Sequence, residues 1–353
     1  MPDEAAVREV LKTVKYPGFS RDIISFGLVK SIDVDGSKVR VLISFATADP
    51  NIPEQIYAEA KQKLESLPGV SEVALEMDLK QPPRQAPTGA ALQEMPQIEG
   101  VKWIVAVASG KGGVGKSTVA ANLAVSLERT GCRVGLCDCD LYGPSIPLMF
   151  GTDEQPMAND REQIIPIRAH GLQLMSIGFL AGDDTPVIVR GPLATRYVQD
   201  FLRRVAWDHL DYLVLDLPPG TGDIQLTIVQ TVALAGAIIV TTPQEVALID
   251  ARKAAAMFGR VNVPILGLVE NMSYFLCPSD GKRYDIFGTC GGQTEAKRLG
   301  VPFLGEVPID IETRKSGDEG RPIALRKPTE SAVSAAFEQI ARTLRKQVEA
   351  TKA

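Results

Sequence analysis

The most informative part of the sequence is the glycine-rich run Gly110-Lys111-Gly112-Gly113-Val114-Gly115-Lys116-Ser117-Thr118. It fits the pattern G-x-x-x-x-G-K-[ST], with an apolar strand-like run before it and a helical pattern after it. Glycines let the backbone wrap around phosphate groups with its N–H groups pointing inward, and the following helix adds the positive end of its dipole. Lys116 can then reach the β- and γ-phosphates, and the Ser117 hydroxyl can bind Mg²⁺. The run therefore predicts a site for a nucleoside triphosphate.

On both sides of this run, short apolar stretches alternate with helical patterns. Continuous apolar stretches between helices are typical of a parallel sheet that is buried on both faces. The last helix, about 330–348, carries one apolar stripe. We therefore expect an α/β fold of the P-loop NTPase type, with a mostly parallel sheet covered by helices on both faces. The expected strands are 104–108, 134–137, 212–215, 237–240, 265–269 and 303–307.

A different pattern precedes residue 80. A helical pattern at 5–14 is followed by two alternating strands, 28–34 and 39–45, that are joined at Asp35-Gly36, a hairpin signal. A helix at 53–67 and a strand at 70–77 complete a small α+β domain. A proline-rich stretch without apolar periodicity follows, which predicts a linker. The expected organisation is a small domain at 1–80, a linker at 81–99 and the P-loop domain at 100–353.

Three carboxylates follow predicted strands of the P-loop domain. Asp138 and Asp140 come after the strand 134–137, and Asp216 closes the strand 212–215. Carboxylates at the carboxyl ends of parallel strands face the ligand crevice of an open α/β sheet. Asp216 fits the acidic residue that holds Mg²⁺ through its water shell. The loop 218–223, rich in proline and glycine, is suited to a switch that senses the γ-phosphate.

Composition limits the classes of protein that fit. The 353 residues carry a net charge of −5, which argues against a chain that coats nucleic acid or an anionic membrane. Five cysteines are too few for a disulfide scaffold of this length, and two histidines leave little room for a histidine-rich metal site. The N-terminus lacks the pattern of a secretory signal, and no apolar stretch approaches the roughly 20 residues that span a bilayer. We expect a cytoplasmic protein with reduced thiols.

Lys111, near the start of the loop, resembles the second lysine of the MinD/ParA/nitrogenase-reductase class of ATPases. In that class the lysine crosses a dimer interface, so the resemblance implies a homodimer that encloses two ATP molecules. It also makes Asp140 the residue expected to orient the attacking water, and it implies that Asp138 supports the Mg²⁺ shell. Asn271 and the segment 307–310, with Pro308 and Asp310, are then expected to contact the adenine.

Further motifs resemble one subfamily, the Mrp/ApbC-type iron–sulfur cluster carrier ATPases. They are DCDLYGPSIP at 138–147, VRGP at 189–192, DYLVLDLPPGTGDIQLT at 211–227, TTPQEVAL at 241–248 and ENMSYF at 270–275. Residues 22–29 and 67–77 resemble the small MIP18-like (DUF59) domain that often precedes this ATPase. The resemblance implies ATP binding and hydrolysis, Mg²⁺, and transient carriage of a cluster, most simply 4Fe–4S, to apo-proteins together with the assembly machinery.

The cysteines depart from the family pattern. The family usually carries C-P-x-C after N-M-S-x-F, but here Cys277-Pro278-Ser279-Asp280 has an aspartate in the second thiol position. Cys277 and Cys290 from each of two subunits in a dimer would supply four ligands. Alternatively, Asp280 is an oxygen ligand. The third alternative is that this chain has lost cluster binding. The small domain also lacks the usual cysteine in its turn at 46–53.

The other thiols, Cys132, Cys137 and Cys139, are expected to be structural, with residues 137 and 139 on the same face of their strand. If the cluster is absent, the alternative function is a MinD/ParA-like nucleotide switch or an ATP-binding scaffold. The C-terminal helix offers little apolar surface for membrane binding, and the acidic balance disfavours a DNA-bound switch.

Overall fold

The computed structural model describes residues 2–15, 22–25, 28–45, 51–79, 97–180, 198–199 and 201–350. The chain divides into two compact units, Met1–Ala91 and Leu92–Ala353, which we call the small unit and the large unit. Most of the predicted linker, the turn at 46–50 and the VRGP segment at 189–192 lie outside the described residues.

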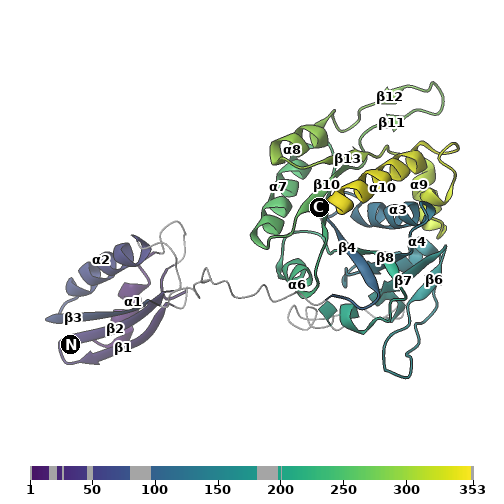
Figure 1. Ribbon diagram of the computed structural model, residues 1–353. Coiled ribbons are helices and arrows are strands. Elements are labelled where there is room, and N and C mark those ends of the chain that lie inside the picture. The colour runs from purple at the N-terminus through teal and green to yellow at the C-terminus, as the bar shows by residue number, and fades with distance from the viewer. Residues whose placement is uncertain are drawn as a thin grey trace. The chain divides into compact units, whose positions relative to one another are not determined.

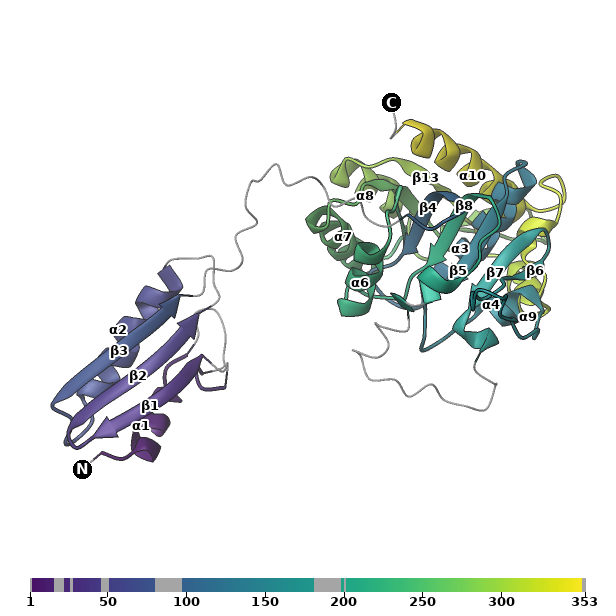
Figure 2. The ribbon, with the colours of Figure 1, turned by 60° about the horizontal axis from the view of Figure 1, so that its bottom comes forward.

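The large unit is built on one sheet (Figures 1 and 2). Its described strands lie in the order β13-β10-β9-β4-β8-β5-β7-β6, and neighbouring strands are parallel except for the pair β6–β7. The prediction of a mostly parallel sheet is therefore confirmed. The strands are β4 (Val101–Ala108), β5 (Val134–Asp138), β6 (Ile167–Ala169), β7 (Leu172–Ser176), β8 (Leu210–Asp216), β9 (Gly236–Thr241), β10 (Ile265–Glu270) and β13 (Phe303–Glu306).

Helices cover both faces of this sheet, as predicted. One face of the strands shares a buried core with α3 (Lys116–Arg129) and α10 (Ala332–Ala350), and the other face packs against α6 (Asp223–Thr231) and α7 (Glu245–Arg260). The predicted stripe of the last helix, Val333, Phe337, Ile340 and Leu344, is fully buried against the first face. The remaining helices are α4 (Ile146–Phe150), α8 (Gly291–Leu299) and α9 (Ile311–Asp318), with short 3₁₀ turns η1 (Ile177–Phe179) and η2 (Ile323–Leu325).

Two hairpins of the large unit were not predicted. Strands β6 and β7 form an antiparallel hairpin through His170 and Gly171, both of which have positive φ. A histidine in that conformation is uncommon, so the turn gives little signal in the sequence. A second hairpin pairs β11 (Phe275–Leu276) with β12 (Arg283–Tyr284) and carries Cys277 at its loop.

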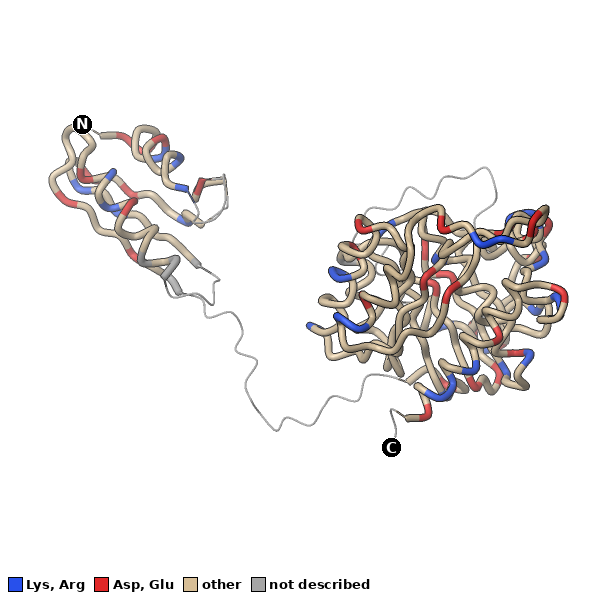
Figure 3. Tube along the Cα trace, turned by 90° about the horizontal axis from the view of Figure 1, so that it is seen from above, with Lys and Arg blue, Asp and Glu red and all other residues tan. Residues whose placement is uncertain are grey.

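The small unit has the predicted α-β-β-α-β order. Strands β1 (Val29–Asp35) and β2 (Lys38–Phe45) are antiparallel, and β3 (Glu72–Leu79) adds to β2 in parallel. Helices α1 (Glu4–Leu11) and α2 (Asn51–Glu65) bury apolar residues with alternate positions of β2, including Val39, Val41 and Ile43. Basic and acidic positions are interspersed along the trace of each unit, in line with the small net charge (Figure 3).

Candidate functional site

The glycine-rich loop joins β4 to α3, as predicted, and its tight path needs glycine at two places. A Cβ at Gly110 would lie 2.0 Å from the Asp250 carbonyl oxygen of α7. Gly115 has φ +78°, and a Cβ there would lie 2.2 Å from Nδ2 of Asn271. Because a Cβ at Gly110 would overlap backbone and the positive φ at Gly115 favours glycine, the loop packs closely against both α7 and the end of β10.

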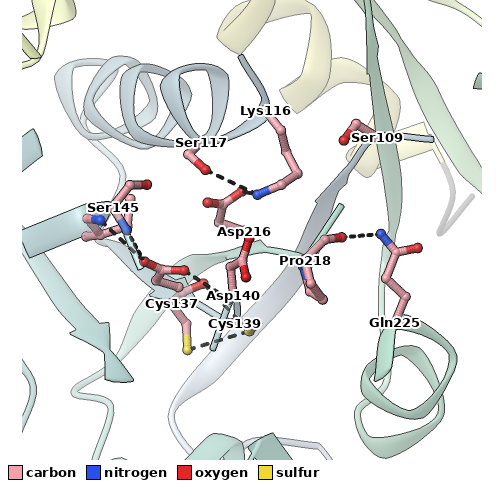
Figure 4. Close-up of polar contacts among 12 residues, drawn as sticks. Ser109, Lys116, Ser117, Cys137, Cys139, Asp140, Ser145, Asp216, Pro218 and Gln225 are labelled. Carbon is pink, nitrogen blue, oxygen red and sulfur yellow. Dashed lines mark hydrogen bonds and ion pairs between the residues drawn. The ribbon is translucent and has the colours of Figure 1, made fainter. Parts of the chain in front are cut away.

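Lys116 and Asp216 form a buried ion pair at the centre of the site (Figure 4). Lys116 Nζ also lies 3.2 Å from the Ser117 hydroxyl oxygen. Burial raises the pKa of the Asp216 carboxyl, and the ion pair with Lys116 opposes that rise. The second oxygen, Oδ2, is buried and has no hydrogen-bond partner among the described residues. An unpartnered carboxylate oxygen beside a serine hydroxyl fits Mg²⁺, which takes oxygen ligands and keeps several waters.

Asp138 anchors the loop that follows β5. Its carboxylate accepts hydrogen bonds from the N–H groups of Asp140 (3.0 Å), Ser145 (3.0 Å) and Ile146 (3.3 Å), and from the Ser176 hydroxyl (3.2 Å). Burial, with the nearby charge of Asp216, raises the pKa of Asp138 to about 7. Its oxygens are thus already engaged in holding the loop, which makes Asp138 a weaker candidate for the Mg²⁺ shell than Asp216 or Ser117.

A cavity of about 300 Å³ opens between the glycine-rich loop and the loop after β5. Asp140 lines this cavity and is partly exposed; its Oδ1 accepts a hydrogen bond from the Tyr142 N–H (3.2 Å), which leaves Oδ2 to contact a ligand there. The position suits a group that orients water at the terminal phosphate. The cavity is lined by Ser109, Lys111, Gly112, Gly113, Gly115, Lys116, Ser117, Thr118, Asp140, Gly143, Ser145, Met149 and Pro219.

A second cavity, of about 500 Å³, shares Thr118 and Met149 with the first. It contains the three predicted adenine contacts, Asn271, Pro308 and Asp310. The apolar walls include Leu148, Met272 and Phe287, and a largely apolar cavity next to a phosphate site suits a base. The sequence prediction had therefore grouped residues that the fold brings to one place, although they come from different parts of the chain.

Two of these residues also hold the site in shape. Asn271 Nδ2 donates a 2.9 Å hydrogen bond to the Val114 carbonyl oxygen in the glycine-rich loop. The Asp310 carboxylate accepts a hydrogen bond from the Thr313 N–H (2.9 Å) and so caps the start of α9. Sequence reasoning did not predict either contact, because both depend on the tertiary arrangement.

Cys277 lies at the loop of the β11–β12 hairpin and is partly buried. Its sulfur lies 3.0 Å from the Ser279 hydroxyl, and this contact, with the N–H groups of Ser279 and Asp280, lowers the pKa of the Cys277 thiol. Asp280 accepts hydrogen bonds from the Lys282 N–H (3.0 Å) and the Tyr284 hydroxyl (2.9 Å). The hairpin therefore presents a thiol whose lowered pKa favours the thiolate, the form that binds a metal.

The other thiols are arranged differently. Cys290 is exposed at the start of α8, and it and Cys277 are both free thiols. Cys137 and Cys139 are buried on one face, with their sulfurs 4.0 Å apart, and Cys132 packs against the opposite core, so the expectation that these three are structural fits their positions. Among the residues described, no group of three or more His, Cys, Asp and Glu side chains could hold a metal ion within one chain.

Two families match the chain. Residues 100–345 match ParA, described as NUBPL iron-transfer P-loop NTPase, and residues 4–75 match the iron–sulfur cluster assembly protein family. The iron–sulfur cluster carrier protein of Deinococcus radiodurans is 44% identical over 346 residues, which cover 97% of this chain and 95% of that protein.

Solved structures agree with this result. A nucleotide-binding protein from Archaeoglobus fulgidus in complex with ADP is 40% identical, with a TM-score of 0.58 over 66% of this chain and 93% of that one. The cell division ATPase MinD of Pyrococcus furiosus is 26% identical, with a TM-score of 0.53 over 69% of this chain and 98% of that one. These matches confirm the predicted fold and the predicted nucleotide-hydrolysing class. The chain belongs to the NUBPL/ParA family of iron-transfer P-loop NTPases.

Proposed function

We propose that this chain is a homodimeric ATPase that binds an iron–sulfur cluster and transfers it to apo-proteins. The relatives' names support the cargo, and the nucleotide site supports the ATPase. The observation that carries the proposal is the connection between the two sites. The segment 273–275, which leads to Cys277, pairs with the segment 307–309 beside the second cavity, where we expect the adenine to bind. The Ser273 N–H donates to the Val307 carbonyl oxygen (3.0 Å), and the Ile309 N–H donates to the Tyr274 carbonyl oxygen (2.7 Å).

In the nucleotide site, the N–H groups of residues 110–118 cradle the phosphates and Lys116 neutralises the β- and γ-phosphates. Ser117 and Asp216 would hold Mg²⁺, which offsets phosphate charge when bound, and Asp138 keeps the neighbouring loop in place. Asp140 orients the attacking water. Lys111, which lines the cavity mouth, reaches the nucleotide of the second subunit.

The cluster, as cargo, is held at the interface between two copies of the chain. A single chain offers no closed ligand set among its described residues, so ligands from both subunits are needed. Cys277 is the first ligand from each subunit, and Cys290 is the proposed second, which gives four thiolates and favours a 4Fe–4S cluster. Asp280 is the competing second ligand because it shares the hairpin loop with Cys277.

The experiment is anaerobic reconstitution of the full chain with iron and sulfide, followed by iron and sulfide analysis and a visible spectrum. Cys277→Ser is expected to abolish the cluster, while Cys132→Ser is the matched control that keeps it. If Cys290→Ser loses the cluster and Asp280→Ala keeps it, the result supports four thiolate ligands. If Asp280→Ala loses the cluster and Cys290→Ser keeps it, Asp280 is the second ligand. A wild-type protein that holds no cluster contradicts the carrier function.

That last outcome would leave the nucleotide-switch function, which the aspartate at position 280 favours. Under either function the partners are a second copy of the chain and, for the carrier, assembly machinery and apo-proteins. The part of the chain that the structure describes contains no helix long and apolar enough to cross a membrane. All five cysteines are free thiols, which suits work in the reducing cytoplasm.

A further inference from the structure

We propose that the Ser145 hydroxyl donates a hydrogen bond to the γ-phosphate of bound ATP and thereby distinguishes ATP from ADP. This inference rests on the proposed ATP function and adds a residue that the motifs did not assign. Ser145 lines the phosphate cavity together with Lys116, Ser117 and Asp140. Figure 4 shows Ser145 across from Ser117 and Asp216, on the loop after β5.

The hydroxyl of Ser145 is buried, and no group in the described part of the chain forms a hydrogen bond with it. A buried polar group without a partner is costly and therefore uncommon, so each one calls for an explanation. Ser145 precedes α4, but its side chain does not cap that helix. The Asp138 carboxylate accepts hydrogen bonds from the backbone N–H of Ser145 and from the hydroxyl of Ser176, but not from the hydroxyl of Ser145. The Ser145 hydroxyl thus has no protein partner to give up when a ligand enters the cavity that Ser145 lines.

The position of Ser145 points to the terminal phosphate. Asp138 binds the N–H groups of both Asp140 and Ser145, so one carboxylate holds both residues toward the same cavity. The glycine-rich loop forms the other wall, where Lys116 serves the β- and γ-phosphates. A donor on the facing wall therefore meets the phosphate farthest from the base. The contact is absent when ADP is bound, because ADP lacks that phosphate.

The test is calorimetric titration of the full chain with Mg²⁺ and either ADP or a non-hydrolysable ATP analogue. Hydrogen bonds to charged groups contribute enough that Ser145→Ala should weaken analogue binding by about tenfold or more. Binding of ADP should stay within about twofold of the wild type on the same basis. Ser145→Thr keeps the hydroxyl and should restore most of the analogue affinity.

Two controls separate this function from a structural one. Without nucleotide, Ser145→Ala should unfold at or above the wild-type temperature, because the lost hydroxyl has no hydrogen bond to break and its burial without a partner is costly. Ser176→Ala removes a contact to the same Asp138 without touching the cavity, so it should leave the ratio of analogue to ADP affinity unchanged.

An equal loss of ADP and analogue affinity in Ser145→Ala, or no loss at all, would overturn the inference. So would a drop in the unfolding temperature that accounts for the loss. These outcomes leave the proposed function standing as long as the wild type binds ATP. A wild type that binds no nucleotide contradicts the proposed function itself.

Discussion

In the absence of nucleotide, Lys116 and Asp216 neutralise each other while 6% and 0% exposed. Removing one partner leaves the other charge buried and uncompensated. Breaking such a pair typically costs about 3–5 kcal/mol, so Lys116→Met and Asp216→Asn should each lower the free energy of unfolding of the large unit by that amount. The double variant contains no uncompensated charge. Its decrease in the free energy of unfolding should therefore be smaller than the sum of the decreases in the two single variants by at least about 2 kcal/mol.

The assay is urea unfolding of the full chain without nucleotide, followed by tryptophan fluorescence. Both tryptophans, Trp103 and Trp207, lie in the large unit, so the signal reports that unit alone. Four proteins complete the cycle: the wild type, the two single variants and the double variant. If the decrease in the double variant equals the sum of the two single decreases to within about 0.5 kcal/mol, the two charges do not interact in solution, and the buried ion pair is contradicted.

The same pair predicts a pH dependence. Burial raises the pKa of Asp216 in the folded chain above its ordinary 3.8, and Lys116 opposes the rise. In Lys116→Met the opposition is gone, so the folded state favours the protonated carboxyl. A raised pKa in the folded state gives stability that is complete below the ordinary pKa and is lost as the pH rises through the folded pKa. The stability deficit of Lys116→Met should therefore widen from acidic to neutral pH; a constant deficit would contradict this.

Three further predictions concern other parts of the chain. Gly115→Ala places a methyl group against the Asn271 amide at positive φ and should weaken ATP binding by about tenfold or more, measured by calorimetry; unchanged affinity would contradict the loop geometry. Phe337→Ala empties a fully buried site and should lower the free energy of unfolding by about 3–5 kcal/mol in the fluorescence assay. A loss of less than about 1 kcal/mol would mean that α10 does not pack there. Ser279→Ala removes the main cause of the lowered Cys277 pKa, so alkylation of Cys277 by iodoacetamide at pH 7 should slow, with Ser37→Ala as an unaffected control.

Local patterns were sufficient to predict the fold. The apolar runs, the stripe of α10 and the alternation in β2 report burial directly, and burial decides which face of each element packs. The β6–β7 hairpin was missed because its turn, His170-Gly171, does not show a common hairpin signature. The resemblance to a known family then located residues, such as Asn271 and Asp310, that only the tertiary fold brings together.

Contacts between distant segments could not be predicted. The engagement of Asp138 with three N–H groups, and the unpartnered oxygens of Asp216 and Ser145, depend on how the loop after β5 closes on itself and on β8. Nor could the sequence show that Asp280 shares a hairpin loop with Cys277 while Cys290 begins a separate helix. Such details follow from the chain path in three dimensions rather than from residue type and spacing.

Cluster delivery to apo-proteins is the activity that we propose for this ATPase. The most direct measurement is anaerobic transfer from the reconstituted dimer to the apo form of a 4Fe–4S enzyme, with recovered enzyme activity as the readout and a chelator present to trap free iron. Wild-type protein with Mg·ATP should restore activity, and Cys277→Ser, carried through the same reconstitution, should not. Equal recovery of enzyme activity with wild type and Cys277→Ser would contradict cluster delivery. So would no recovery of enzyme activity with a wild type that has been shown to hold a cluster.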